Sequence, residues 1–347
     1  MAGRSLCSRG IGGVRLDSVL LGCQPERLPT VRGLAAMKAT AQPRADQTIT
    51  LADGRTLAFS EWGSPTGHPV MLVHGGPGSR LLCPDEDATA AAGVRLLTAD
   101  RPGYGGSDAR PDPTLLGWAD DVQALADRLG LERFAVVGFS AGGGYALACA
   151  ASMPERISAV GLACCEGPYD EVPGAWQQGM TPEERTLFEL IRRDPIAARG
   201  AVAAHVGWYQ DPDTIWESEP PAVDVAILAR SDVRDALTRM SREGARQGVE
   251  GLVDDWIALS LPWGFAFADV KVPVSVWHGE LDHLVEPAHP HYLSAVLPNS
   301  TLVLYPEDGH LLLLQHWSEI LAAVTAAGET KDSAAERHEH GGRPAPQ

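Results

Sequence analysis

The chain has 347 residues, of which 44% are hydrophobic and 21% charged, and a formal net charge of −17. This composition is typical of a globular protein and excludes an extended disordered chain. The acidic balance argues against nucleic acid and anionic lipid as partners, because both are bound through Lys and Arg. No apolar stretch approaches the ~20 residues that a membrane-spanning helix needs. We therefore expect a cytoplasmic protein without nucleic-acid or membrane partners, and the composition leaves its oligomeric state open.

The two ends of the chain differ from the middle. Residues 1–36 contain five arginines and two acidic residues, a net charge of +3, so the remainder carries −17 − 3 = −20. An Arg-rich, acid-poor start is typical of a transit peptide, and an over-extended gene start before Met37 is the plainer alternative. We expect residues 1–46 to be an extension outside the fold and residues 328–347, which are polar, to be a disordered tail.

Six cysteines show no spacing typical of a disulfide framework or a zinc site, so we expect buried thiols. They are Cys7, Cys23, Cys83, Cys149, Cys164 and Cys165.

Short apolar runs alternate with helix-length segments along the middle of the chain. The later runs are apolar nearly throughout, as strands buried on both faces are. The alternation predicts an α/β fold whose mostly parallel sheet carries helices on both faces, and the Asp53-Gly54 turn predicts an antiparallel hairpin at the sheet edge. The strand-like runs are 48–53, 56–63, 69–75, 95–100, 133–140, 157–164, 273–279 and 301–309, and the helical segments are Leu115–Leu129, Ala141–Met153, Pro287–Leu297 and Leu312–Ala327.

One long segment interrupts this alternation and contains no strand-like run. Thr181-Pro182-Glu183-Glu184 predicts a capping box that opens a helix, and helical patterns follow at Val225–Arg239 and Gly248–Leu261. We interpret the segment as a helical lid over the carboxyl edge of the sheet, with a decorative insertion as the alternative. The expected division is a core of residues 47–166 and 265–327 and a lid of residues 167–264.

A nucleophile motif follows the predicted strand at 133–140. Gly138-Phe139-Ser140-Ala141-Gly142 fits G-x-S-x-G, with a helix of small residues after it. The serine of this motif lies on a sharp, strained turn, so the positions two residues before and after it must lack side chains. Gly138 and Gly142 meet that need. Ser140 is therefore the predicted nucleophile, at the N-terminus of a helix whose dipole stabilises negative charge.

A serine needs a base and an orienting acid to act as a nucleophile at neutral pH. His310 and Asp282 each follow a predicted strand, so both should reach the edge where Ser140 emerges. The chain order Ser140, Asp282, His310 is the order that this architecture uses. Glu280 is the alternative acid and Asp308 a further neighbour. A metal site among His278, His283, His289 and His291 is disfavoured, because their positions give no tetrahedral pattern.

A glycine-rich loop follows the predicted strand at 69–75 and reads His74-Gly75-Gly76-Pro77-Gly78. Glycines there let backbone N–H groups approach a bound carbonyl oxygen closely. We expect the amides of Gly76 and Ala141 to form the oxyanion hole. His74 should brace the loop by hydrogen bonds, supported by Gly75 and Gly78. The loop Asp100–Ser107 is interpreted as structural, with Tyr104 or Ser107 as polar wall.

The four motifs, in this order, resemble the α/β-hydrolase superfamily, in the branch with HGGPG and DRPGYGGS sequences and a helical cap. The resemblance covers roughly residues 47–327 and implies an eight-stranded sheet with Ser140, Asp282 and His310 as the catalytic triad. HGGPG also resembles proline iminopeptidases, but those carry a G-G-S-W-G elbow that this chain lacks. Haloalkane dehalogenases and epoxide hydrolases place Asp where this chain has Ser140.

The predicted function is hydrolysis of an ester or amide in a small-molecule acyl substrate, through an acyl-enzyme and without metal or organic cofactor. A carboxylesterase (EC 3.1.1) is favoured. The alternatives are a proline iminopeptidase-like aminopeptidase, an acyltransferase, C–C hydrolase or haloperoxidase-like enzyme on the same triad, and a non-catalytic binding protein. Aromatic residues of the lid could line an acyl pocket or simply pack. Glu166, Asp170 and Glu171 could bind a substrate amine or be solvated.

Overall fold

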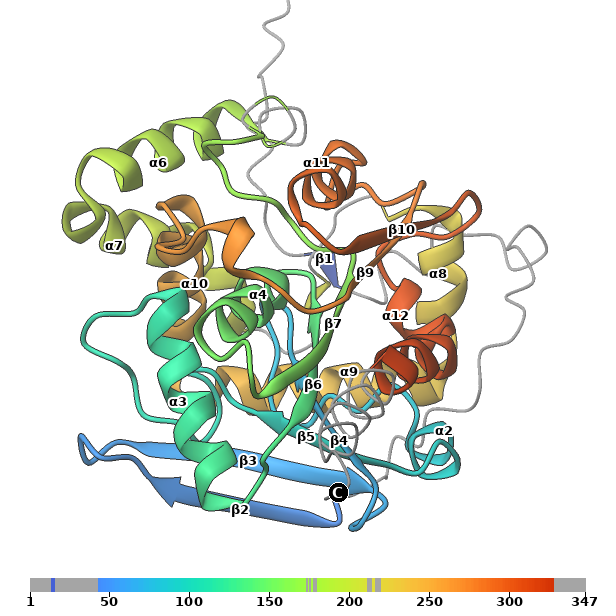
Figure 1. The fold of residues 1–347 in the computed structure, drawn as a ribbon. Helices are drawn as coiled ribbons and strands as arrows, with labels where there is room; N and C mark the ends of the chain where they lie inside the picture. The colour runs from blue at the N-terminus through green and yellow to red at the C-terminus, as the bar shows by residue number, and fades with distance from the viewer. Residues whose placement is uncertain are drawn as a thin grey trace, which may run out of the picture.

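The computed structural model describes residues 14–15, 43–172, 174, 176, 180–210, 214–215 and 220–327, and Figure 1 shows their arrangement. Eight strands form one sheet in the order β10-β9-β7-β6-β4-β5-β3-β2. Neighbouring strands from β10 to β5 are parallel, whereas β3 pairs antiparallel with both β5 and β2. The strands are β2 (Ala45–Thr50), β3 (Thr56–Gly63), β4 (His68–Val73), β5 (Val94–Ala99), β6 (Phe134–Phe139), β7 (Ile157–Ala163), β9 (Val274–Gly279) and β10 (Ser300–Tyr305).

Helices cover both faces of the sheet, as the alternating pattern predicts. Figure 1 shows α3 and α4 on one side and α2 and α12 on the other. The edge hairpin is also confirmed, since β2 and β3 pair antiparallel around a turn in which Gly54 has a φ of 88°. The helices of the core are α2 (Glu86–Ala91), α3 (Leu115–Arg128), α4 (Gly142–Ser152), α11 (Ala288–Val296) and α12 (Leu312–Gln315), with a further helical stretch at 317–327.

Two hydrophobic cores lie on opposite faces of the sheet, and strand β6 contributes to both. Phe134 and Val136 belong to the core under α3 and α4, whereas Ala135, Val137 and Phe139 belong to the core that contains Leu312 and Trp317. Successive side chains of a strand point to opposite faces, so a strand buried on both faces needs apolar residues at nearly every position. Strand β6 is buried along its whole length, as its continuous apolar run predicts.

Between β7 and β9 lies the helical insertion, which comprises α6 (Pro182–Arg193), α7 (Pro195–His205), α8 (Ala222–Leu228), α9 (Ser231–Gly244) and α10 (Glu250–Ser260). Helix α6 begins with the predicted capping box: Thr181 Oγ1 accepts from the Glu184 N–H and the Glu184 carboxylate accepts from the Thr181 N–H. In α7, Asp194 accepts the N–H of Ala197, an N-cap of the usual kind.

Three expectations for the helices and strands were wrong in detail. The single helix expected over Val225–Arg239 is two helices, α8 and α9, because Arg230 adopts an extended backbone (φ −74°, ψ 121°) between them. The helix expected from Leu312 to Ala327 is interrupted at His316. The insertion also contains a two-residue strand, β8 (Thr214–Ile215), which pairs antiparallel with β1 (Val14–Arg15). The remainder of residues 1–42 and the whole of 328–347 lie outside the described residues.

None of the described helices combines the length and the apolar character that crossing a membrane requires. The four cysteines in the described part of the chain, Cys83, Cys149, Cys164 and Cys165, are free thiols.

Candidate active site

Ser140 lies on a strained turn between β6 and α4. Its φ is 52°, in the left-handed region that non-glycine residues rarely adopt. The two glycines of the motif make the turn feasible. A Cβ at Gly138 would lie 2.7 Å from the Gly142 carbonyl oxygen, and a Cβ at Gly142 would lie 2.3 Å from the Val73 carbonyl oxygen. The structure therefore has the sharp strand–turn–helix geometry that the spacing of G-x-S-x-G predicts.

His310 and Asp282 come together at the same edge of the sheet. His310 Nδ1 donates to Asp282 Oδ2 at 2.8 Å, and both residues are 2% exposed. Asp282 Oδ1 accepts the N–H groups of Leu284 and Val285, at 2.9 and 3.0 Å. Burial alone would raise the pKa of the Asp282 carboxyl, but the charge and hydrogen bond of His310 hold that pKa below its usual value. Asp282 is thus an ionised, fixed partner for the imidazole.

The two alternative acids lie elsewhere. Glu280 is exposed, and its N–H donates to the Tyr305 carbonyl. Asp308 pairs with His316, whose Nε2 is 2.7 Å from Asp308 Oδ2. Of the acids in this region, the structure brings Asp282 to the His310 ring.

The His310 imidazole has one nitrogen left for chemistry. Its Nε2 is buried and has no hydrogen-bond partner among the described residues. Phe139, the residue before Ser140, lies with its ring centroid 5.3 Å from that of His310. Burial lowers the pKa of His310, but the charge and hydrogen bond of Asp282, with smaller contributions from Asp224 and Glu166, raise it to about 9.

The glycine-rich loop after β4 lies against the serine turn. A Cβ at Gly75 would be 3.1 Å from the Ser140 Cβ, and a Cβ at Gly76 would be 3.6 Å from the Ala141 Cβ. The two residues expected to provide oxyanion donors, Gly76 and Ala141, are therefore neighbours. Ala141 is also the residue from which α4 begins, so its amide lies at the positive end of the helix dipole.

His74 is positioned to hold the glycine-rich loop through hydrogen bonds. Its Nδ1 lies 2.7 Å from the Gly75 carbonyl oxygen, and its Nε2 accepts the Arg101 N–H at 3.3 Å. Burial and the nearby Arg101 charge put the pKa of His74 well below its usual value, so the ring is neutral. A Cβ at Gly78 would lie 2.7 Å from His74 Nδ1, so this glycine leaves room for the ring.

A buried polar cluster beneath this loop was missed by sequence reasoning. Arg101 is 1% exposed, donates to the carbonyl oxygens of His74 and Gly75, and pairs with Asp255 of helix α10 at 2.5 Å. Asp255 also accepts the hydroxyls of Tyr104 and Tyr145, at 2.6 and 2.8 Å. Arg101 and Asp255 are 154 positions apart, so no local pattern signals the pair. The cluster connects the helical insertion to the glycine-rich loop His74–Gly78.

The two residues suggested as polar wall have structural contacts instead. The Tyr104 hydroxyl donates to the Asp255 carboxylate. Ser107 Oγ donates to the Asp100 carbonyl and accepts the Ala58 N–H. Both side chains are 1% exposed.

One group of three side chains in the described part of the chain could hold a metal ion, namely Cys164, Asp282 and His310, whose ligand atoms lie within 4.8 Å of one another. Burial and the Asp282 charge raise the pKa of the Cys164 thiol well above its usual value, so the thiol is protonated and a poor ligand. In the described part of the chain the clustered histidines form no such group: His278 and His289 are buried, whereas His283 and His291 are exposed.

Glu166 lies at the site, following β7. Burial raises its pKa to about 7, with His310, Asp282 and Asp255 as the charged groups that act on it. Glu166 is partly exposed, so it is less solvated than a surface side chain. Asp170 forms an ion pair with Arg192 and is half exposed, whereas Glu171 is exposed.

The described aromatic side chains of the insertion pack mainly on one another. Trp256 contacts Phe188 and His205, with ring centroids 5.4 and 5.0 Å apart, and Trp263 packs on Phe265. Trp176 donates its indole N–H to the Gly167 carbonyl. Trp216 and the side chain of Trp208 lie outside the described residues.

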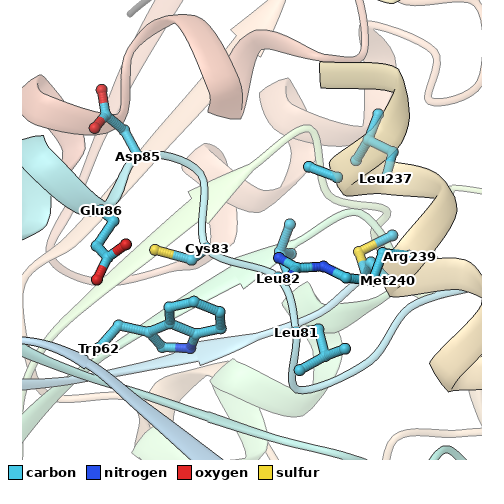
Figure 2. A pocket seen from close by; sticks show the side chains of 10 residues that line it. Trp62, Leu81, Leu82, Cys83, Asp85, Glu86, Leu237, Arg239 and Met240 are labelled. Atoms are coloured by element: carbon cyan, nitrogen blue, oxygen red, sulfur yellow. The ribbon is translucent and has the colours of Figure 1, made fainter. Parts of the chain in front are cut away.

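Two cavities lie on the α9 side of the site. The inner one is lined by residues beside the predicted catalytic residues, and the outer one is shown in Figure 2. Leu82, Leu237 and Met240 line both. In the outer cavity Arg239 and Met240 reach in from α9 opposite Trp62 and Glu86. The inner cavity is lined by Gly75, Pro77, Leu82, Phe139, Leu237, Met240, Leu311 and Leu314.

Comparison with known proteins identifies the family. Residues 68–198 match the family model of the alpha/beta hydrolase fold. The chain is 31% identical to a pimeloyl-[acyl-carrier protein] methyl ester esterase of Aromatoleum aromaticum, over 65% of this chain and 84% of that protein. The chain belongs to the α/β-hydrolase superfamily.

Other members of the superfamily agree with this assignment. The chain is 28% identical to a 2-hydroxy-6-oxononadienedioate/2-hydroxy-6-oxononatrienedioate hydrolase of Burkholderia vietnamiensis, over 76% of this chain and 88% of that protein. An esterase from Exiguobacterium antarcticum has the same fold, with a TM-score of 0.59 and 21% identity over 82% of this chain and all of that one. These relatives are hydrolases, which places this α/β hydrolase among the hydrolytic enzymes of the superfamily.

Proposed function

We propose that this α/β hydrolase is a serine hydrolase that cleaves an ester bond of a small-molecule acyl substrate through an acyl-enzyme. The observation that carries the proposal is the buried 2.8 Å hydrogen bond between His310 and Asp282, at the sheet edge where the backbone of Ser140 is held at a φ of 52°. The similarity to a methyl ester esterase supports the choice of an ester, as in a carboxylesterase of EC 3.1.1. In this proposal the helical insertion serves as the lid of the site.

The reaction begins at His310 Nε2. That nitrogen takes the proton of Ser140 while Asp282 holds the other nitrogen, Nδ1, in its protonated form. Ser140 Oγ attacks the ester carbonyl, and the amides of Gly76 and Ala141 stabilise the oxyanion. His310 then gives the proton to the leaving alcohol, and water hydrolyses the acyl-enzyme by the same steps. No step in this sequence uses a metal or an organic cofactor.

The strained turn has a role in this scheme. A left-handed serine between β6 and α4 directs its side chain away from both elements and toward the edge of the sheet. Ser140 is 7% exposed, so a substrate can reach the hydroxyl while bulk water is largely excluded. Such a site strengthens the electrostatic contribution of the oxyanion donors.

Glu166 favours a second candidate, an aminopeptidase related to the proline iminopeptidases. The Glu166 carboxyl lies close enough to His310 and Asp282 for their charges to influence its pKa. A cationic substrate amine would favour the ionised form of Glu166. An aminopeptidase needs an anionic group beside its nucleophile to hold the free amino terminus. Glu166 is the carboxyl of this site that is free to take that part, because Asp282 and Asp255 are engaged by His310 and Arg101.

A substrate panel tests the proposal and separates the candidates. Purified protein is assayed on p-nitrophenyl esters of graded acyl length and on an aminoacyl-naphthylamide. We expect ester hydrolysis in the wild type and a fall of about 10⁶-fold in kcat for Ser140→Ala. Ser158→Ala, which alters a buried serine on β7 with no hydrogen-bond partner among the described residues, is the matched control and should retain full activity. Activity on the amide alone would favour the aminopeptidase, and full ester hydrolysis by Ser140→Ala would reject the triad.

A further inference from the structure

Helix α8 of the insertion reaches the loop that carries His310. Asp224 on this helix is 2% exposed, and its carboxylate accepts two consecutive backbone N–H groups of that loop. The His310 N–H donates to Asp224 Oδ2 at 2.8 Å, and the Leu311 N–H donates to Asp224 Oδ1 at 3.1 Å. Burial raises the pKa of the Asp224 carboxyl, and the charge of His310 and the two N–H groups act against that rise. A single side chain of the insertion therefore makes two hydrogen bonds to the backbone at the predicted base.

The loop is shaped to receive this carboxylate. A Cβ at Gly309 would lie 2.4 Å from Asp224 Oδ2, a distance that no side chain tolerates. The glycine directly before His310 thus leaves the space that the Asp224 carboxylate fills. The close approach accounts for a glycine at this position in Asp308-Gly309-His310.

Apolar contacts fix α8 in place on either side of Asp224. Val223 and Ile227 of α8 form a hydrophobic cluster with Leu311 and Leu314, which follow His310 in the chain. The helix is therefore docked on the histidine loop by packing as well as by the two hydrogen bonds. A buried carboxylate flanked in this way has little freedom to move without also moving the loop.

Three carboxyl groups face His310, each from a different element. Asp282 follows β9 and bonds the ring, Glu166 follows β7, and Asp224 comes from the insertion; His278 on β9 faces Asp282. Asp224 bonds the backbone of the histidine and adds negative charge near its ring. Its contribution to catalysis would combine position and charge.

We infer that Asp224 is a positioning residue for the general base, through which the helical insertion holds the His310 loop in register with Ser140 and Asp282. This inference rests on the proposed function, because it needs His310 to be the base. In this inference the insertion contributes to catalysis, because the position of the base depends on how α8 packs against the His310 loop.

The test is Asp224→Asn, which keeps the size of the side chain but removes the charge and places an NH₂ group against a backbone donor. We expect kcat to fall about 10- to 100-fold with little change in KM, because a small displacement of a catalytic group has this effect. The acid limb of the kcat/KM profile should move by about one pH unit to lower pH, because removing a negative charge lowers the pKa of His310. Active sites are counted by titration with a fluorophosphonate, so that unfolded protein does not enter kcat.

Asp232→Asn is the matched control. Asp232 is also a carboxylate of the insertion, on the neighbouring helix α9, but it pairs with Arg230 at the surface. This variant should keep the wild-type kcat and pH profile. Wild-type kcat and an unchanged acid limb in Asp224→Asn would overturn the inference, even if its thermal stability fell, because that result would show a role in folding only.

A second variant keeps the test decisive if Asp224→Asn does not fold. Gly309→Ala leaves the Asp224 charge in the protein and displaces the carboxylate from the two N–H groups. A loss of kcat in Gly309→Ala supports the inference, and unchanged kcat and KM overturn it. Failure of the proposed function is seen separately, as full activity in Ser140→Ala.

Discussion

The parallel sheet and the helical insertion contribute to the candidate site by different routes. The sheet supplies the predicted catalytic residues, since Ser140, Asp282 and His310 each follow a strand of the sheet at its carboxyl edge. The insertion supplies none of these three residues. Two of its buried aspartates instead bind the loops that lie next to them. Asp224 of α8 accepts two N–H groups of the His310 loop. Asp255 of α10 pairs with Arg101, which donates to a carbonyl oxygen of the glycine-rich loop His74–Gly78.

This difference separates what the fold provides from what the insertion adds. Strand order alone brings the ends of β6, β9 and β10 to one edge, so the residues that follow these strands lie at that edge. The loops that carry them still need acceptors for buried N–H groups and partners for buried charge. Here those partners come from helices that follow β7 in the chain. The geometry of the site therefore depends on how the insertion packs on the core.

After Ser140→Ala, the largest effect on the sheet side is expected from Asp282→Asn. An amide at this position would favour the wrong tautomer of His310, and a change of this kind lowers kcat by about 10⁴-fold. Glu280→Gln is the matched control, because Glu280 is exposed and lies two residues away. Steady-state ester hydrolysis measures both. An active Asp282→Asn together with an inactive Glu280→Gln would show that the acid has been assigned to the wrong residue.

On the insertion side, Asp255→Ala should destabilise the protein by about 3 to 5 kcal/mol, because it leaves Arg101 charged and unpaired in the interior. Glu250→Ala on the same helix removes an exposed partner of Arg199 and should cost below about 1 kcal/mol. Urea denaturation followed by circular dichroism gives both values. Equal stabilities of the two variants would contradict the view that α10 is anchored through Asp255.

The pH dependence of activity gives the smallest of these effects and addresses both regions at once. The base must be neutral to accept the Ser140 proton, and burial, Asp282, Asp224 and Glu166 together place the pKa of His310 at about 9. We therefore expect kcat/KM to rise with pH, to reach half of its plateau near pH 9 and to level off above that pH. A stopped assay over pH 6 to 10 measures the limb. A plateau already reached at pH 6 would show that the surrounding carboxyls do not control the imidazole.

Much of the sheet and of the geometry of the candidate site could be predicted from sequence, for identifiable reasons. Residue spacing in Gly138–Gly142 encodes a turn that only glycines permit, and the continuous apolar runs before Ser140 and Asp282 mark strands buried on both faces. The carboxyl ends of parallel strands share one edge, so positions just after the strands were sufficient to bring His310 and Asp282 together.

The insertion was less predictable, because its important contacts are long-range. Asp224 and His310 are 86 positions apart, and Asp224 sits in a short, mostly buried helix with no motif around it. The break between α8 and α9 falls at Ala229 and Arg230, where neither Gly nor Pro signals a helix end. The Arg101–Asp255 pair likewise depends on how α10 packs on the core, which no local pattern encodes.

The most direct test of the central claim, that Ser140 is the nucleophile, is peptide mapping by mass spectrometry after labelling with a fluorophosphonate. We expect a single phosphonyl adduct per chain on Ser140 in the wild type and no adduct in Ser140→Ala. An adduct on a different serine, or ester hydrolysis that continues while Ser140 is fully labelled, would contradict it.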